Sequence, residues 1–358
     1  MGWKRFGLVL GALLAASAPA TAQTSNTAKD PEWKGCHGGE YLYTAGAISI
    51  DACNRILATR SLTARERAVT LQRRGEREYH DQRLPAAIAS FTEALGVSGL
   101  ADADRIYVLR HRAQAHAANS DDTAARRDYD AAVKISPGQT NIWRGTHALE
   151  RDRAADARSD ADAALATLAP KDFYRWEAYE LRGRARFLLK EEAGALADFG
   201  AAIKVYDSAS PHLYRGSAFE ALGRFEEALA DYILATERAG SPADAWNAAC
   251  WTLAASLRRD FERARSYCEG AISRDTDNAT YVDSLGLVWL QLGRWQDAWN
   301  AYDRIVRGVA EPWAGAYHGR GLAALRLGKT TEGRADLAKA AAIDPQIAQA
   351  YAGYGQKP

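Results

Sequence analysis

An internal repeat of about 34 residues constrains this chain more than any other feature of its sequence. Eight segments can be set in register, each opening with a small residue. A second small residue follows twelve positions later, mostly an aromatic residue four positions after that, and mostly Ala three further on. We call the opening positions the register residues: Gly75, Ala113, Gly145, Gly183, Gly216, Thr252, Gly286 and Gly321. Their spacing of 32 to 38 residues is typical of equivalent units joined by loops of different length.

The residue types in each segment predict a pair of antiparallel α-helices. Only ten of the 358 residues are Pro, which leaves long stretches free to form helix. Gly223, Gly293 and Gly328 lie seven residues after their register residues, where a first helix is expected to end. The small residues let two helices approach closely, and the aromatic residue fills the space toward the next pair. A chain of 358 residues exceeds one ordinary core, so its length predicts two or more domains or a repeat array.

This pattern, small–x11–Ala–x3–aromatic–x2–Ala, resembles the tetratricopeptide repeat family. The resemblance covers about Val69 to Pro345, and it departs from the pattern at Ala161 and Cys268, which stand where an aromatic residue belongs. The last three segments also resemble exported bacterial repeat proteins of unassigned role. The resemblance implies an all-α fold, a right-handed superhelical solenoid of about eight helix hairpins.

The two ends of the array are expected to carry capping helices, which solenoids need to cover their terminal repeats. Ala47–Leu57 aligns with a second helix that lacks a first, and Gln346–Tyr354 is predicted to form a short solvating helix. We therefore divide the chain into a signal peptide at 1–22, an extended or disordered segment at 23–45 and a solenoid at 46–358.

The N-terminus has the features of a cleaved secretory signal. Lys4 and Arg5 precede the apolar run Phe6–Ala16, which is too short to span a bilayer, and Ala20-Thr21-Ala22 matches a cleavage site. A mature chain beginning at Gln23 would be periplasmic or secreted. No cysteine follows the cleavage site directly, so no lipid anchor is predicted, and no later stretch predicts a transmembrane anchor.

The four cysteines, Cys36, Cys53, Cys250 and Cys268, all follow the predicted cleavage site, and an oxidising compartment permits disulfides. Repeats contact mainly their neighbours, so the local pairing is favoured among three connectivities: Cys36 with Cys53, and Cys250 with Cys268. Free thiols buried in the core are the alternative. A metal site at Cys36 and His37 lacks a second pair of ligands, and we predict no metal and no other cofactor.

An arginine precedes the register residue in six segments, and an aspartate follows five of those arginines by sixteen positions. The two segments without the arginine carry Trp251 or Leu285 in its place, and they lack the aspartate too. Residues equally far before and after a hairpin turn face each other, and a guanidinium group can bind a carboxylate through two hydrogen bonds. We predict partly buried ion pairs between Arg112 and Asp128, Arg144 and Asp160, Arg182 and Asp198, Arg215 and Asp231, and Arg320 and Asp336. Ligand binding by these arginines is the alternative, and five copies of one pair argue against a catalytic centre.

Function is expected in the concave groove, which the first helices of a solenoid line. First-helix positions close to the register residue predict a chemically mixed set of lining residues that names no single ligand class. They are Tyr79, Arg110, Gln114, Glu180, Arg184, Trp246, Asp283 and His318.

The sequence contains no motif that predicts an enzyme. Its seven histidines are scattered without H-E-x-x-H, and neither G-x-S-x-G after a strand nor a P-loop occurs. The formal charge of +1 favours no nucleic-acid partner. We predict an exported, non-enzymatic scaffold that binds a peptide or protein in its groove. The alternative is a structural accessory subunit of a cell-envelope assembly or secretion complex.

Overall fold

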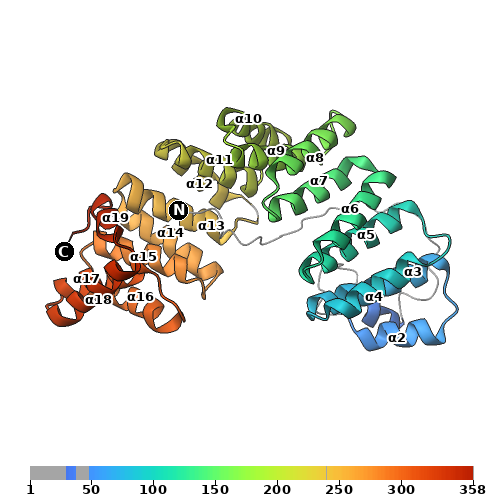
Figure 1. Ribbon diagram of the computed structural model, residues 1–358, viewed down its shortest axis with the longest axis horizontal. Coiled ribbons are helices and arrows are strands. Elements are labelled where there is room, and N and C mark those ends of the chain that lie inside the picture. Colours follow the sequence, from blue (N-terminus) through green and yellow to red (C-terminus); the bar gives the residue numbers. More distant parts are fainter. Residues whose placement is uncertain (1–29, 38–47, 239, 358) are drawn as a thin grey trace. The chain divides into compact units, whose positions relative to one another are not determined.

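The computed structural model describes residues 30–37, 48–238 and 240–357. Every regular element in these ranges is a helix, in the order labelled in Figure 1. The chain divides into two compact units, of which one includes Leu13–Lys190 and the other Glu191–Pro358. We call their described parts the N-terminal and C-terminal units. No helix in either part is long and apolar enough to cross a membrane. The predicted signal peptide lies outside the described residues.

The N-terminal unit contains nine helices among its described residues, and three successive pairs, α3–α4, α5–α6 and α7–α8, pack as hairpins. The helices are α1 (Pro31–His37), α2 (Ile50–Thr59), α3 (Ala64–His80), α4 (Leu84–Leu95), α5 (Asp102–Ala118), α6 (Asp122–Ile135), α7 (Pro137–Glu150), α8 (Ala154–Thr167) and α9 (Arg175–Leu188).

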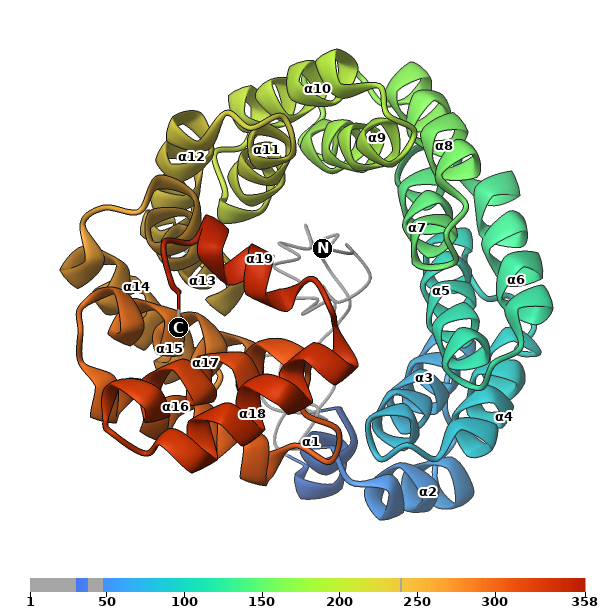
Figure 2. The ribbon, with the colours of Figure 1, turned by 60° about the vertical axis from the view of Figure 1, so that its left-hand side comes forward.

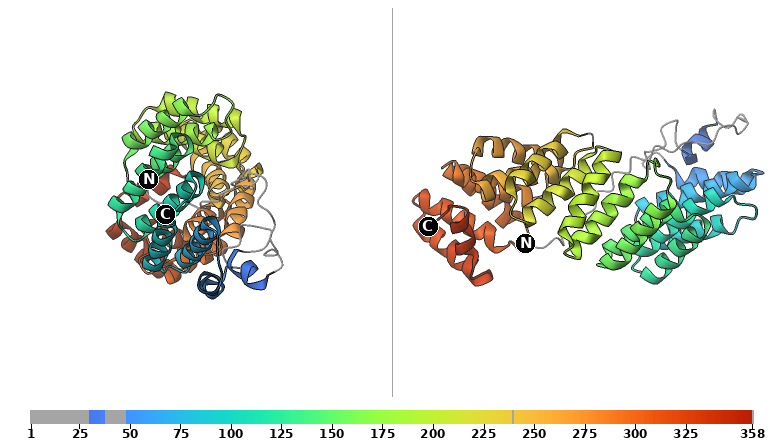
Figure 3. Two further views of the ribbon diagram at one scale, coloured as in Figure 1. Left: turned by 90° about the vertical axis from the view of Figure 1, so that its right-hand side faces the viewer. Right: turned by 90° about the horizontal axis from the view of Figure 1, so that it is seen from above.

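The C-terminal unit continues with four more hairpins, α11–α12, α13–α14, α15–α16 and α17–α18, which follow one another as layers (Figure 3). The α-helices are α10 (Glu192–Val205), α11 (Ala209–Ala221), α12 (Phe225–Glu237), α13 (Ala243–Trp251), α14 (Phe261–Arg274), α15 (Ala279–Gln291), α16 (Trp295–Gly308), α17 (Ala314–Arg326), α18 (Thr330–Ile343) and α19 (Ile347–Gly353). The expected all-α array of helix hairpins is confirmed, with short helices α2 and α19 near its ends.

Each regular hairpin turns at a residue with left-handed backbone seven positions after the register residue. Gly223, Gly293 and Gly328 have φ angles of 72°, 71° and 78°, which glycine adopts without steric cost. The equivalent residues without glycine are Gln82 (59°), Ser120 (63°), Asp152 (57°) and Lys190 (65°). The position in the turn, more than the residue type, therefore ends the first helix.

At three register glycines, Gly75, Gly216 and Gly286, an aromatic ring lies directly against the backbone and leaves no room for a side chain. A Cβ atom on Gly216 would lie 2.7 Å from the ring of Tyr232, and one on Gly286 would lie 2.7 Å from the ring of Tyr302. Both tyrosines are buried in the core of the C-terminal unit. The small residue and the aromatic residue of the repeat pattern are therefore in contact. The first helix carries the glycine, and the second helix carries the ring.

Both local disulfides are present. Cys36 in α1 is bonded to Cys53 in α2, and Cys250 in α13 is bonded to Cys268 in α14. The described cysteines therefore have no free thiol. Pro31–His37 is helical, which corrects the extended segment expected there; Cys36 is buried and Trp33 packs on the same small cluster as Ile56. The rest of the segment expected at 23–45 lies outside the described residues, apart from Asp30.

The α13–α14 hairpin departs from the others at its turn. Thr252–Leu257 forms a π-helical segment (η4), and the turn that follows has left-handed backbone at both Arg258 (52°) and Asp260 (50°). Such a segment inserts an extra residue into a helix. This hairpin is also one of the two that lack the arginine and the aspartate.

Candidate functional site

The ion pair at Arg215 and Asp231 joins α11 to α12 through two hydrogen bonds. Nε of Arg215 donates to Oδ2 of Asp231 at 2.7 Å, and a terminal guanidinium nitrogen donates to Oδ1 at 2.7 Å. His212 adds a third partner, with Nδ1 at 2.9 Å from Oδ1 of Asp231. Burial raises the pKa of Asp231, but the hydrogen bonds from Arg215 and His212 outweigh it and leave the pKa below its ordinary value. The carboxylate is therefore ionised and held on three sides.

Three other hairpins contain the same pair. Arg112 and Asp128 approach to 2.6 Å, Arg144 binds Asp160 through Nε at 3.1 Å, and Arg320 binds Asp336 at 2.7 and 2.8 Å. Arg182 and Asp198 fall in different units, so their pairing stays a prediction. The sixth arginine, Arg74, donates to the hydroxyl of Ser90, and that hydroxyl donates to Glu78.

The arginines also reach the second helix of the preceding hairpin, a contact that sequence reasoning missed. The partner is the residue directly after the aromatic position: Thr92 for Arg112, Asp130 for Arg144, Asp162 for Arg182 and Asp303 for Arg320. The sequence does contain a signal for this contact, since polar residues recur at the position directly after the aromatic one. Arg112, Arg144 and Arg320 therefore each tie three helices together, and the role that this contact pattern favours is structural.

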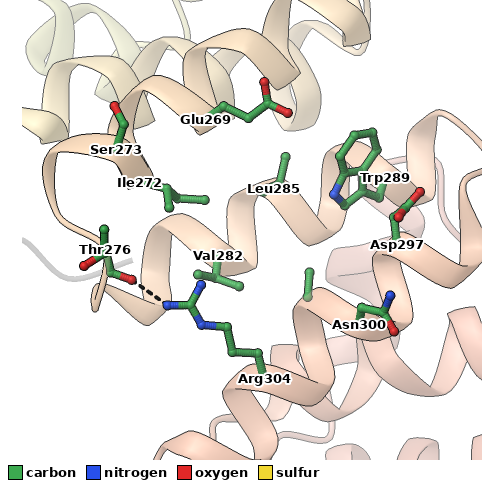
Figure 4. Close-up of a pocket in the computed structure, with 11 residues that line it drawn as sticks. Glu269, Ile272, Ser273, Thr276, Val282, Leu285, Trp289, Asp297, Asn300 and Arg304 are labelled. Atoms are coloured by element: carbon green, nitrogen blue, oxygen red, sulfur yellow. Dashed lines mark hydrogen bonds between the residues drawn. The ribbon is translucent and has the colours of Figure 1, made fainter.

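In the two hairpins that lack the ion pair, uncharged side chains take the positions of the arginine and the aspartate. Trp251 and Tyr267 stand at the two places in α13–α14, next to the Cys250–Cys268 disulfide, and Leu285 and Ala301 stand there in α15–α16. All four side chains pack against the core of the C-terminal unit. An open cleft of about 480 Å³ remains between α14 and α16, over α15 (Figure 4). Its floor is apolar, from Ile272, Val282, Leu285 and Ala301, and its rim carries Glu269, Asp297 and Arg304.

The first helices of each unit form a second surface, which we call the first-helix face. In the N-terminal unit, Arg110 of α5 lies over the ring of Trp143 of α7 at 4.5 Å. Glu180 and Arg184 of α9 are mostly buried, with 3.9 Å between their charged groups. Tyr79 and Gln114 are half-buried on α3 and α5. Five of the predicted groove residues thus belong to one unit and carry charged or polar groups at its first helices.

Glu177, one turn before Glu180 on α9, was missed by sequence reasoning. Burial and the neighbouring Glu180 carboxylate raise its pKa to about 7, although Arg110 acts in the opposite direction. Burial also raises the pKa of Glu150, at the end of α7, against the influence of Arg151 and Arg184. Glu177 is therefore poorly solvated, whereas Glu150 is exposed, and a cationic group brought next to Glu177 would lower its pKa.

In the C-terminal unit, Asp283 of α15 and His318 of α17 belong to the first-helix face, but the chain covers them. His318 is 2% exposed, and its ring lies 4.6 Å from that of Tyr351 in α19. Burial raises the pKa of Asp283 to about 7, with a hydrogen bond from Trp313 acting against it. Figure 2 shows α19 on the side of α13 and α17, away from α14.

Trp246 is not part of this face. Its ring lies against the backbone of Gly270 in α14, beneath the guanidinium of Arg274 at 4.0 Å, and its indole nitrogen donates to Ser241 at 2.9 Å. Trp246 precedes its register residue by six positions, whereas Asp283 and His318 precede theirs by three, which turns the side chain by about 60° around the helix. This correction removes one of the eight predicted groove residues.

Among the described residues, no group of three or more His, Cys, Asp or Glu side chains is placed to hold a metal ion. The arrangement offers two kinds of surface instead, a polar first-helix face and an apolar cleft between second helices. Both are of a kind that binds other proteins through side-chain contacts.

Models of the tetratricopeptide repeat match residues 193–245, 253–312 and 314–347. A comparison with curated proteins finds no match. The fold is similar to that of yeast Tom70, with 15% sequence identity and a TM-score of 0.51 over 82% of this chain and 64% of that one. It is also similar to a chain of the APC/C hetero-tetramer Cut9–Hcn1, with 14% identity and a TM-score of 0.53 over 85% of this chain and 58% of that one.

A tetratricopeptide repeat protein from Parabacteroides merdae matches with 16% identity and a TM-score of 0.47, over 70% of this chain and 99% of that one. At such identities the structural matches bear on the fold alone, whereas the repeat models match the sequence directly. Taken with the repeated helix hairpins, these matches show that the chain contains tetratricopeptide repeats within residues 193–347, as part of an all-α solenoid of helix hairpins.

Proposed function

We propose that this chain is an exported scaffold, periplasmic or secreted, that binds a peptide or protein partner along its first-helix face and catalyses no reaction. The observation that carries the proposal is the chemistry of that face in the N-terminal unit. Arg110 on α5, and Glu177, Glu180 and Arg184 on α9, are held in partly buried positions, where they are desolvated before any partner arrives. A polar surface that is already ordered loses little entropy on binding.

Two further observations support the proposal. The raised pKa of Glu177 favours a partner with a basic group, because a cation beside this carboxyl group would stabilise its ionised form. Export is supported by two disulfides, a bond that persists mainly in oxidising compartments, and by the predicted signal peptide.

The test is site-specific photocrosslinking in the intact cells that produce the protein. A photoreactive residue at Arg184 should capture a partner by its first-helix face, whereas the same residue at Lys134, exposed on the second helix α6, should not. Capture at both sites or at neither would contradict the proposed face. Fractionation of the same cells should recover a mature chain beginning near Gln23 outside the cytoplasm.

The alternative, a structural accessory subunit of an envelope-assembly or secretion complex, is favoured by the cleft between α14 and α16. Such a subunit would use its second-helix side as well as its first-helix face, and the cleft gives that side an apolar site. The two functions differ in stoichiometry, since an accessory subunit should co-purify with its complex in fixed ratio. A transient peptide binder should be recovered as a monomer.

A further inference from the structure

The C-terminal segment 347–357 runs back across the first-helix face of the C-terminal unit. Its helix α19 contacts α17 and α18. Beyond α19, the carbonyl of Tyr354 accepts a hydrogen bond of 2.6 Å from the side chain of Gln291, at the end of α15. The ring of Tyr354 meets that of Trp251, at the end of α13, with 5.4 Å between centroids. The segment therefore reaches two hairpins back along the unit, further than a cap for α17–α18 requires (Figure 2).

One side chain anchors this segment. Tyr351 is 4% exposed, and its hydroxyl donates to the carbonyl of Gly315 at 2.9 Å and lies 3.2 Å from the hydroxyl of Tyr302. Tyr354 is half-buried, while the side chains of Gln349 and Lys357 are exposed. A segment with a single buried side chain can detach at much lower free energy than the global unfolding of its domain.

The segment also leaves polar groups beneath it without full hydrogen bonding. Neither ring nitrogen of His318 has a hydrogen-bond partner among the described residues, and Oδ1 of Asp283 has none there either. A buried polar group without a partner carries a desolvation cost that a hydrogen bond would remove. An occupant that supplies those hydrogen bonds would bind this face better than the chain's own segment does.

We propose that the face of α13, α15 and α17 is a peptide-binding groove and that segment 347–357 is its built-in competitor. The partner it fits is a protein segment that places a tyrosine in the site of Tyr351 and offers hydrogen-bond donors to Asp283 and His318. Since the competitor is tethered, its effective concentration is on the order of millimolar, and the partner must overcome it. This inference rests on the proposed function, because it assigns part of the partner binding to the C-terminal unit and adds a step that regulates it.

The experiment uses purified full-length protein and a fluorescein-labelled peptide with the sequence of residues 345–358, followed by fluorescence anisotropy. The peptide should bind Tyr351→Ala at least ten times more tightly than it binds the unaltered chain, because the variant no longer anchors its own segment. Lys357→Ala is the matched control: its exposed side chain lies in the same segment, and it should bind the peptide as weakly as the unaltered chain. A peptide that itself carries Tyr351→Ala should bind neither the Tyr351→Ala chain nor the Lys357→Ala chain.

Two results would overturn the proposal: equal binding of the peptide to the unaltered chain and to Tyr351→Ala, or no binding to Tyr351→Ala at all. Tyr354→Ala serves as a second variant, with an expected gain in peptide binding in the same direction. Hydrogen exchange measured by mass spectrometry on the same samples checks folding, because segment 347–357 should exchange faster in both variants while α15 and α17 stay protected. None of these measurements needs the cellular partner, so they can succeed even where crosslinking at Arg184 captures nothing.

Discussion

Within the C-terminal unit, hairpins α11–α12 and α15–α16 meet the same packing requirement with opposite chemistry. In α11–α12, Arg215 and Asp231 form a two-fold hydrogen-bonded ion pair between the helices, and His212 supports it. In α15–α16, Leu285 and Ala301 take these places and pack against the core. Both hairpins form, so the ion pair is not required for the hairpin itself. The space beside the hairpin also matters, since Leu285 lines an open cleft toward the preceding second helix.

The arginine residues determine whether the space between two successive second helices is filled or open. Arg144 and Arg320 fill the space toward the preceding second helix by donating to Asp130 and Asp303. At the equivalent place beside Leu285 stands Glu269, on the rim of the cleft. The cleft therefore includes the place that an arginine side chain occupies in those hairpins. The loss of one ion pair turns a structural contact into a surface that can receive a partner.

The largest expected effect comes from breaking the ion pair on one side. Asp231→Ala leaves the Arg215 guanidinium between two helices without its acceptor and leaves His212 with Asp207 alone, and it should lower the free energy of unfolding by about 3–5 kcal/mol. The double variant Arg215→Leu with Asp231→Ala, which copies α15–α16, should recover most of that loss. Chemical denaturation followed by circular dichroism measures both, and the transition assigned to the C-terminal unit is the one to compare.

The matched control for this cycle is the exposed pair of Arg224 and Glu227 on the same helix pair. Glu227→Gln should leave the denaturation curve unchanged, because an exposed ion pair contributes little. If the double variant at Arg215 and Asp231 is as unstable as Asp231→Ala alone, the two kinds of hairpin are not interchangeable and the comparison fails.

The second expected effect concerns the disulfide of α13–α14, the other hairpin without an ion pair. Replacing Cys250 and Cys268 together by Ser should cost about 3 kcal/mol, as closure of a loop of this length predicts. Hydrogen exchange should show the loss in α13 and α14 first, with α17–α18 still protected by Arg320 and Asp336. Equal loss of protection in both hairpins would mean that the disulfide does not act locally.

Much of this architecture could be predicted from the sequence because it repeats. The register residues, the turn positions and the ion pairs each recur, so one interpretation is checked several times within a single chain. His212 and the segment around Tyr351 could not be found in this way, since each occurs once and its contacts join residues far apart. The helix at Pro31–His37 likewise rests on contacts that occur once, among them its disulfide to Cys53 and the ion pair of Glu32 with Arg55.

The third prediction contrasts the pH dependence of two buried carboxyl groups. Burial raises the pKa of Asp283 to about 7, so folding favours its protonated form. Between pH 5 and 7 the unfolded chain has released this proton while the folded chain still holds it, so stability should fall as pH rises, by about 1 kcal/mol per pH unit. Asp283→Asn should remove this contribution to the slope. For Asp231 the dependence of stability on pH has the opposite sign. Its pKa is lowered in the folded chain, so its contribution to stability is lost as pH falls below about 4.

Thermal or chemical denaturation at several pH values separates the two groups. The groups that face Asp283 are Trp313, which donates to it, and the tyrosines Tyr302, Tyr351 and Tyr354, which stay neutral in this range because their pKa values are raised. The slope between pH 5 and 7 is therefore assigned to Asp283 as the difference between the unaltered chain and Asp283→Asn. An identical slope in both would place the titrating group elsewhere.

The smallest expected effect is also the most direct test of what the cleft is. Leu285→Arg with Ala301→Asp would install the missing ion pair in α15–α16, and Glu269 already stands where the preceding second helix supplies an acceptor to the other arginines. The net change in stability should lie within about 1 kcal/mol, because a paired charge and a packed apolar residue are nearly equivalent at such a site. The coupling between the two substitutions in a double-mutant cycle should nevertheless exceed about 0.5 kcal/mol. Coupling near zero would mean that the new side chains do not meet, and the cleft would then owe its shape to the backbone of α14–α16 and not to the absence of one arginine.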